Sequence, residues 1–229
     1  MEKIHMNAFD QTGIASQVIE KAIASGASLA GIANVVSLRD TPSYKIYGPV
    51  EWPVEAKSTL VLALPHEASD PELDWWDDKK GGTPGNRQLI KMAKSLSKCL
   101  SEEFNIRVRP LPYHVEKGGI FLKDAAVLAG LGIIGKNNLL ITPGFGPRVR
   151  LRALFLDLVL ESTGPIDFNP CEACNNMPCR HSCPQNAFRD GSYNRMLCNE
   201  QMKRDEANKA IFVKYCRACE LACVAYGYR

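Results

Sequence analysis

The segment CEACNNMPCRHSCP at residues 171–184 decides the fold of this chain, together with Cys198 and the segment YCRACELAC at residues 215–223. These segments hold eight of the nine cysteines. The first run places three cysteines on one short stretch, so three thiolates can reach three corners of one iron-sulfur cubane. Its fourth cysteine precedes a proline, and in two-cluster ferredoxins the cysteine at that position ligates the other cluster. The spacing therefore predicts two iron-sulfur clusters.

The second run mirrors the first with a C-x2-C-x3-C spacing, and the isolated cysteine lies far enough upstream to complete a set. By the crossed logic of the ferredoxins, each cluster takes ligands from both runs. This assigns one 4Fe-4S cluster to Cys171, Cys174, Cys179 and Cys223, and the other to Cys183, Cys198, Cys216 and Cys219. A segment of about 60 residues buries little apolar surface, so metal ligation would supply much of its folding free energy.

Two other uses of the cysteines are less favoured by the pattern. Zinc ribbons close one tetrahedron with two separated C-x2-C pairs and seldom place four cysteines within so short a stretch ending in Cys-Pro. Disulfides require an oxidising compartment, and nothing in the sequence suggests export. The pattern departs from the ferredoxins in two places: a four-residue gap at Asn175–Pro178, and Val224 where a proline would follow the last cysteine.

The composition is that of a globular protein without a signal for export. The 229 residues carry a net charge of +3 and are 45% hydrophobic, so no dense basic surface for nucleic acid or membrane is indicated. The first thirty residues lack an apolar signal-peptide core, and no run is long enough to span a membrane. We expect a cytoplasmic protein. Cys99, the ninth cysteine, falls in a helical pattern and is expected to be a small buried hydrophobe.

The rest of the chain alternates helical and strand patterns, which indicates an α+β protein. We expect a larger domain at residues 1–165 and a small one at residues 166–229. Segments 41–53 and 71–85 are rich in proline, glycine and aromatic residues and are expected to be loops. The expected helices cover Ala8–Ser25, Asn86–Phe104 and Leu122–Leu131, followed by a tight glycine turn at Gly132–Lys136. The expected strands cover Leu29–Val36, Thr59–Leu64, an edge strand at Arg107–Pro112 and a central strand at Val149–Glu161.

The stretch AGLGIIGKNNLLITPGFGPRVRL at residues 129–151 is not a nucleotide fingerprint. Asn137 stands where a phosphate-binding loop has Ser or Thr, and the glycines follow a helix instead of opening one. This stretch, the cysteine layout and the sequence MLCNEQ around Cys198 resemble the epoxyqueuosine reductase family from about Ser58 to Cys223. The resemblance implies a nitroreductase-like α/β domain that binds cobalamin, followed by a ferredoxin-like domain with two 4Fe-4S clusters. Reductive dehalogenases and cobalamin-processing proteins are similar in architecture.

The family's presumed proton donor is a carboxylate in a V-D-x-x-P element, which aligns with VEKGG at residues 115–119. Glu116 is therefore the candidate, with His114 as an alternative. A carboxyl group beside an apolar cofactor would keep its proton because desolvation raises its pKa. A surface glutamate next to Lys117 is an equally good interpretation. Epoxyqueuosine reductases also carry a helical-repeat extension that helps to hold tRNA, and the sequence stops at Arg229 without one.

Basic residues follow the glycine turn. Arg148, Arg150 and Arg152 alternate and so share one strand face, which could grip a corrinoid or RNA, or could simply be solvated. The residues expected to bind the cofactor are Gly132, Gly135, Lys136, Asn137, Asn138, Arg148 and Arg150.

Three functions follow. The first is an enzyme that uses the clusters and a corrinoid to reduce a small molecule or a corrinoid-protein partner, with a ferredoxin or flavodoxin as electron donor. The second is epoxyqueuosine reduction on tRNA. The third is a plain electron carrier without a corrinoid.

Overall fold

The structure is a computed structural model, and it describes residues 8–48, 50–66, 82–208 and 216–227. The chain forms two compact units. The first unit comprises Met1–Leu64, Leu89–Leu131 and Leu151–Ile166, and the second comprises Pro65–Gln88, Gly132–Arg150 and Asp167–Arg229. The expected domain boundary after residue 165 lies one residue before Ile166, where the last segment of the first unit ends. Two earlier segments, however, group with the cysteine-rich end of the chain.

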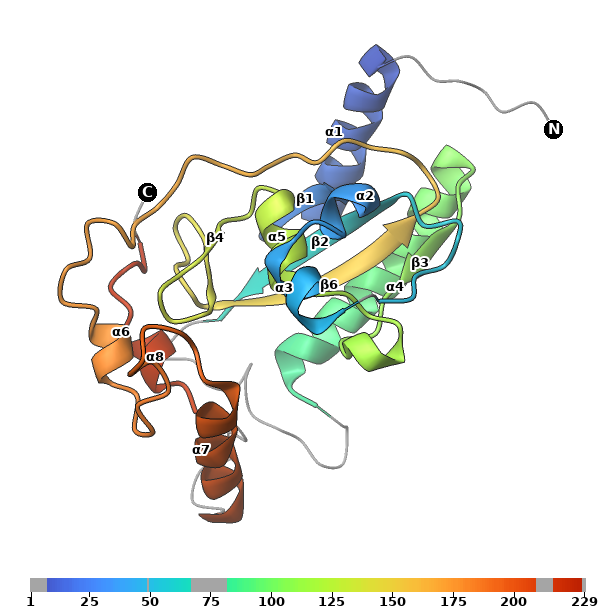
Figure 1. Cartoon of the computed structure of the whole chain (residues 1–229). Coiled ribbons are helices and arrows are strands. Elements are labelled where there is room, and N and C mark those ends of the chain that lie inside the picture. The colour runs from blue at the N-terminus through green and yellow to red at the C-terminus, as the bar shows by residue number, and fades with distance from the viewer. Residues whose placement is uncertain (1–7, 49, 67–81, 209–215, 228–229) are drawn as a thin grey trace. The chain divides into compact units, whose positions relative to one another are not determined.

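A four-stranded sheet in the order β1-β2-β6-β3 organises the first unit (Figure 1). β1 pairs antiparallel with β2, from Leu29 opposite Ala63 to Asn34 opposite Ser58. β3 pairs antiparallel with β6 and lies at the sheet edge, which confirms the expected edge strand. The strands cover Leu29–Asn34 (β1), Ser58–Pro65 (β2), Val108–Pro110 (β3) and Val149–Leu156 (β6).

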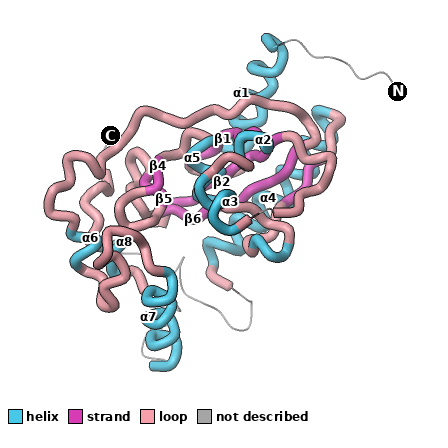
Figure 2. The backbone as a smooth tube through the Cα atoms, viewed as in Figure 1, coloured by secondary structure: helices cyan, strands magenta, loops and turns pink. Residues whose placement is uncertain are grey.

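Two long helices, α1 (Ala8–Ala24) and α4 (Pro84–Phe104), supply the apolar surface that covers this sheet (Figure 2). α5 (Leu122–Leu128) packs against β1. Alternate residues of a strand share a face, so one sheet face meets the apolar stripe of α4. Each leucine buried in this way contributes about 1.5–3 kcal/mol. The core includes Val18, Ala22, Ile32, Leu60, Leu62, Leu89, Ala93, Leu96, Leu100, Leu154 and Leu156.

Several expected boundaries are wrong for local reasons. The first strand stops at Asn34 because its side-chain oxygen accepts a 2.9 Å hydrogen bond from the Val36 amide and caps the short helix α2 (Val35–Leu38). A second short helix, α3 (Pro42–Tyr47), lies in the segment expected to be a loop, with a proline in its first turn. α5 ends at Leu128, three residues early, and Gly130 follows with a positive φ of 73°.

Two further expectations fail near the sheet. β6 ends at Leu156 instead of Glu161, because the Asp157 carboxylate accepts hydrogen bonds from the Arg107 amide at 2.8 Å and from its Nε at 3.0 Å. Cys99 is exposed, so the prediction that it is buried is wrong. The buried stripe of α4 passes through positions 96 and 100, and residue 99 is turned away from it.

The second unit contains little regular structure. β4 (Ile133–Ile134) pairs antiparallel with β5 (Leu140–Ile141), so the expected glycine turn at residues 132–136 is in part a strand. The turn itself follows, where the Asn138 amide donates to the Gly135 carbonyl at 2.9 Å. The helices of this unit are α6 (Pro178–His181), α7 (Arg195–Asn208) and α8 (Ala218–Leu221).

The expected loop at residues 71–85 lies largely outside the described residues. Within the part of the chain that the structure describes, no helix has the length and apolar character needed to cross a membrane.

Candidate metal centre

Four thiols of the second unit surround one cavity. The loop before α6 turns sharply at Met177, which has a φ of 38°, and Pro178 then starts the helix that carries the buried Cys179. The cavity has a volume of about 310 Å³. It is therefore large enough for more than a single ion. We call the cysteines that line it the first thiol group: Cys171, Cys174, Cys179 and Cys223.

The other four thiols form the second thiol group: Cys183, Cys198, Cys216 and Cys219. Their proximity shows in their electrostatics. Burial raises the pKa of Cys219 to about 12, and the other three members of the group add to the rise. Burial also raises the pKa of the Tyr193 hydroxyl, which hydrogen-bonds to Cys198. The backbone amide of Ala187 lies 3.3 Å from the Cys183 sulfur and donates to it.

The two groups are the sets of four that the spacing predicted, and ligation by them stays a prediction. Burial raises the pKa of Cys179, and so do the neighbouring thiols of its own group, beginning with Cys223. Four thiolates gathered around one cavity repel one another. A bound cation removes that penalty, so metal binding and thiol deprotonation are coupled in such a site.

Among the described residues, no three His, Cys, Asp or Glu side chains converge closely enough to hold one metal ion. The thiolates of a zinc tetrahedron all lie about 2.3 Å from the same ion. A 4Fe-4S cluster is larger than one ion, and its four thiolates stand correspondingly farther apart.

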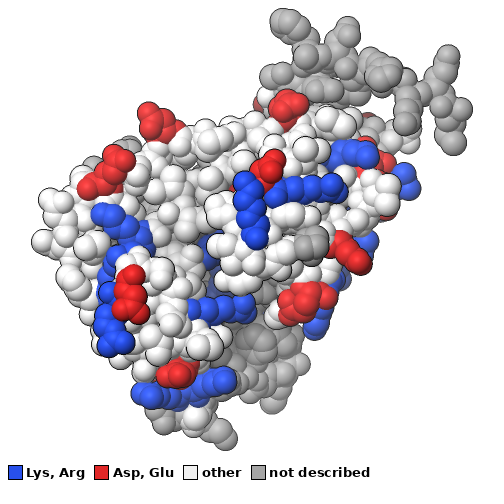
Figure 3. All heavy atoms as spheres, in the orientation of Figure 1, with Lys and Arg blue, Asp and Glu red and all other residues white. Residues whose placement is uncertain are grey.

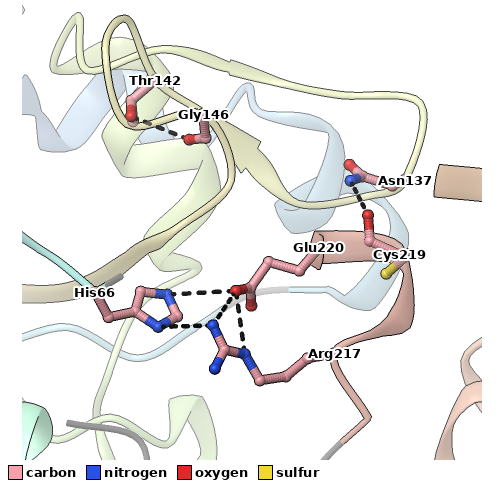
Figure 4. Close-up of polar contacts among 7 residues, drawn as sticks. All are labelled: His66, Asn137, Thr142, Gly146, Arg217, Cys219 and Glu220. Carbon is pink, nitrogen blue, oxygen red and sulfur yellow. Dashed lines mark hydrogen bonds and ion pairs between the residues drawn. The ribbon is translucent and has the colours of Figure 1, made fainter. Parts of the chain in front are cut away.

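The turn between β4 and β5 touches both thiol groups. Lys136 and Asn137 line the cavity, and the Lys136 ammonium donates to the Cys174 carbonyl at 3.4 Å. The Asn137 amide is buried and donates to the Cys219 carbonyl at 3.4 Å (Figure 4). Its oxygen accepts from the Leu139 amide at 3.2 Å, which holds the turn. Two residues predicted to bind a corrinoid therefore hold the cysteine loops.

Other predicted cofactor residues also have contacts inside this unit. A Cβ on Gly132 would lie 2.0 Å from the Ile141 carbonyl oxygen, so this glycine permits β4 and β5 to approach closely. A Cβ on Gly135 would lie 2.6 Å from the Ile141 side chain. Arg148 stacks over the Tyr226 ring at 4.2 Å. Asn138 adopts a φ of 58° in the turn, and Arg150 is half-buried.

The predicted acid residues are exposed. Glu116 and His114 have side chains 72% and 58% exposed, and they lie 3.3 Å apart in and beside the 3-10 helix η2 (Val115–Lys117). This exposed position differs from the apolar surroundings that the prediction assumed, and a catalytic role for Glu116 stays a prediction. Arg152 is 4% exposed and donates to the Leu111 carbonyl at 3.4 Å, so a solvated arginine face is wrong for this residue.

Sequence reasoning missed a buried polar cluster beside the second thiol group (Figure 4). Arg217 and Glu220 form an ion pair at 2.6 Å, with side chains 9% and 11% exposed. His66 completes the cluster, with Nδ1 3.3 Å from the Arg217 guanidinium and Nε2 3.8 Å from the Glu220 carboxylate. The sequence did contain a signal for this pair: Arg217 and Glu220 carry opposite charges three residues apart, a spacing at which side chains on a helix are neighbours.

Glu220→Gln is expected to lower the free energy of unfolding by about 2 kcal/mol, because a buried charged hydrogen bond becomes a neutral one. Urea denaturation of the reconstituted protein measures the change. The matched control is Glu200→Gln on the exposed side of α7, which should stay within about 0.5 kcal/mol of the parent. Equal stability of the two variants would contradict a structural role for the cluster.

One face of the protein carries mixed charge. On the face drawn in Figure 3, basic and acidic side chains are interspersed, and no extended area of one sign is visible there. A mixed surface gives weak long-range attraction for a polyanion.

The chain has relatives of two kinds. No model of a known protein family matches it. Tetrachloroethene reductive dehalogenase of Sulfurospirillum multivorans is 34% identical over an alignment of 110 residues that covers 43% of this chain and 22% of that protein. Epoxyqueuosine reductase of Lactococcus garvieae is 29% identical over an alignment of 146 residues that covers 60% of this chain and 39% of that protein. These matches confirm the resemblance to epoxyqueuosine reductases and reductive dehalogenases that the sequence indicated.

Solved structures show the same mixed helix and sheet fold. An epoxyqueuosine reductase with a tRNA-Tyr epoxyqueuosine-modified stem loop matches with a TM-score of 0.68 at 21% identity, over 96% of this chain and 66% of that one. A reductive dehalogenase, whose structure suggests a mechanism for B12-dependent dehalogenation, matches with a TM-score of 0.57 at 17% identity, over 81% and 27%. The chain thus spans 22% and 39% of the two curated relatives, and their whole activities do not transfer to it directly.

Proposed function

We propose that this chain is an iron-sulfur, corrinoid-dependent oxidoreductase. It passes low-potential electrons through two 4Fe-4S clusters to cobalamin or another corrinoid, and it reduces a small substrate or the corrinoid of a partner protein. The observation that carries the proposal is the gathering of eight thiols into two groups of four, the first around a cavity of about 310 Å³.

The thiol groups fit the clusters. Each supplies the four cysteine ligands that a 4Fe-4S cluster needs, and the first surrounds a space larger than one ion requires. When bound, the clusters supply one-electron carriers of low potential. The chain's own residues hold the ligand loops: Lys136 and Asn137 bind a carbonyl in each of the two cysteine segments.

The proposal that this chain binds a corrinoid is supported by its similarity to the relatives. We propose a nitroreductase-like corrinoid-binding domain at residues 1–165 and a ferredoxin-like domain at residues 166–229. Arg150, Asn138 and the glycines of the turn remain the residues proposed to contact the corrinoid, and Glu116 or His114 to deliver a proton. A ferredoxin or flavodoxin of the cytoplasm would be the electron donor.

A second candidate function is epoxyqueuosine reduction on tRNA. It is favoured by the fold match to the epoxyqueuosine reductase that was solved with a tRNA stem loop. The epoxyqueuosine reductases among the relatives support this function as much as the reductive dehalogenases support the first. Binding to tRNA would weaken steeply as salt is added, because contacts to phosphates release counterions.

Anaerobic reconstitution with iron and sulfide tests the proposal. We expect about eight irons per chain, and a shifted visible band when hydroxocobalamin is added. A colourless protein, or one that holds a single zinc, would contradict the clusters. Eight irons without corrinoid uptake would favour the plain electron carrier. The absence of tRNA binding at low salt would exclude the second candidate.

A further inference from the structure

The two thiol groups lie in opposite electrostatic surroundings, and the first faces cations. Lys136 lines its cavity and reaches the Cys174 carbonyl at 3.4 Å. Arg148 stacks on Tyr226, three residues beyond Cys223, and its buried Nε has no hydrogen-bond partner among the described residues. Both cations therefore lie beside the residues of the first thiol group.

The second thiol group faces an anion. Cys198, Gln201 and Asp205 share one face of α7, because residues three and four apart in a helix are neighbours. The Gln201 amide donates to the Asp205 carboxylate at 2.7 Å and holds it on that face. Among the cations near this group, Arg217 is paired with Glu220 at 2.6 Å, and Arg195 at the start of α7 is exposed, so solvent screens its charge.

Hydrogen bonds to sulfur oppose this difference only weakly. In the first group, backbone amides donate hydrogen bonds to the sulfurs of Cys179 and Cys223. In the second group, backbone amides donate hydrogen bonds to Cys183 and Cys216, and the Tyr193 hydroxyl donates one to Cys198. The second group therefore has one additional neutral donor among the described residues. Full charges act on a cluster more strongly than neutral dipoles do, so this additional donor has a smaller effect than the charged side chains. The carboxylate of Glu172 lies beside the first group, but it is exposed and solvent screens its charge.

We propose that Lys136 and Arg148 make the first thiol group the site of higher reduction potential, and that Asp205 lowers the potential at the second. Reduction adds one negative charge to a cluster, so a nearby cation favours the reduced form and a nearby carboxylate disfavours it. With both clusters bound, an electron that reached the second cluster would therefore move to the first. The second cluster is oxidised as the first is reduced, and no proton needs to move.

This inference rests on the proposed clusters, and redox titration followed by electron paramagnetic resonance tests it separately from activity. Each signal is assigned with Cys223→Ala, which leaves the second cluster, and with Cys198→Ala, which leaves the first. In the parent protein, the first cluster should have the higher midpoint potential. Lys136→Gln should lower that potential by about 59 mV, a tenfold change in the one-electron equilibrium.

Two more variants complete the design. Asp205→Asn should raise the potential of the second cluster and leave the first unchanged. The control is Lys94→Gln, at an exposed position of α4 outside the second unit, which should change neither. If Lys136→Gln loses iron, Arg148→Gln takes its place in the test.

The outcomes separate the two proposals. A reversed order of potentials in the parent, or full iron content with unchanged potentials in the lysine and arginine variants, would overturn the inference alone. A parent protein that assembles no clusters would overturn the proposed function.

Discussion

Cys223→Ala is expected to remove one of the two clusters and to lower the iron content from about eight to about four per chain. Cys223 lies far along the chain from the other cysteines of the first thiol group, and the fold brings it to their cavity. The cluster lost should therefore be the one that Cys174→Ala also removes. Iron determination and the resonance signal of the remaining cluster measure the result.

The reciprocal experiment uses Cys183→Ala. Cys183 follows Cys179 by only four residues, yet it should remove the other cluster, the one that Cys198→Ala removes. Cys99→Ala is the control, because this thiol is exposed and belongs to neither group, and it should keep about eight irons. If Cys183→Ala and Cys174→Ala leave the same signal behind, the crossed assignment is wrong.

Gly132→Ala is expected to lower the free energy of unfolding by about 3 kcal/mol, the upper range for overpacking. The added Cβ would lie 2.0 Å from the Ile141 carbonyl oxygen, which is a backbone atom and cannot rotate away as a flexible side chain could. The strand pair must separate to admit it, and the turn at Lys136 and Asn137 moves with the pair. We therefore also expect weaker cluster retention, measured by visible absorbance during urea denaturation.

The control for this glycine is Gly13→Ala in α1. Nothing lies within 4 Å of a Cβ placed there, so the change should stabilise the helix by about 0.5–1 kcal/mol. A Gly132→Ala variant with parental stability and full iron, but no uptake of hydroxocobalamin, would favour the predicted cofactor contact over the packing role.

Local signals predicted part of the fold well. The central strand β6 and the edge strand β3 were recognisable because burial on both faces and prolines at an edge leave clear patterns. Their ends were not, because β6 stops where Asp157 binds Arg107, a residue about fifty positions away. The helical pattern around Cys99 was right, yet the side of the helix that it occupies was misjudged.

The sequence patterns did not predict which segments of the chain group into each of the two units. The stretch that carries Lys136 lies well before the cysteines, and the resemblance assigned it to a corrinoid. In the structure it contacts the cysteine loops of its own unit. His66 likewise comes from the end of β2 to meet Arg217 and Glu220. Neither contact has a periodic signature in the sequence.

The sequence by itself predicted the chemistry proposed for this protein: eight cysteines have spacings that suit two clusters, because ligand number and loop length are local properties. Only the tertiary structure decided what surrounds each thiol group. Charge and burial at a site are sums over residues that the chain brings together from distant positions, so the cations Lys136 and Arg148 beside one group, and Asp205 beside the other, became visible only in the fold.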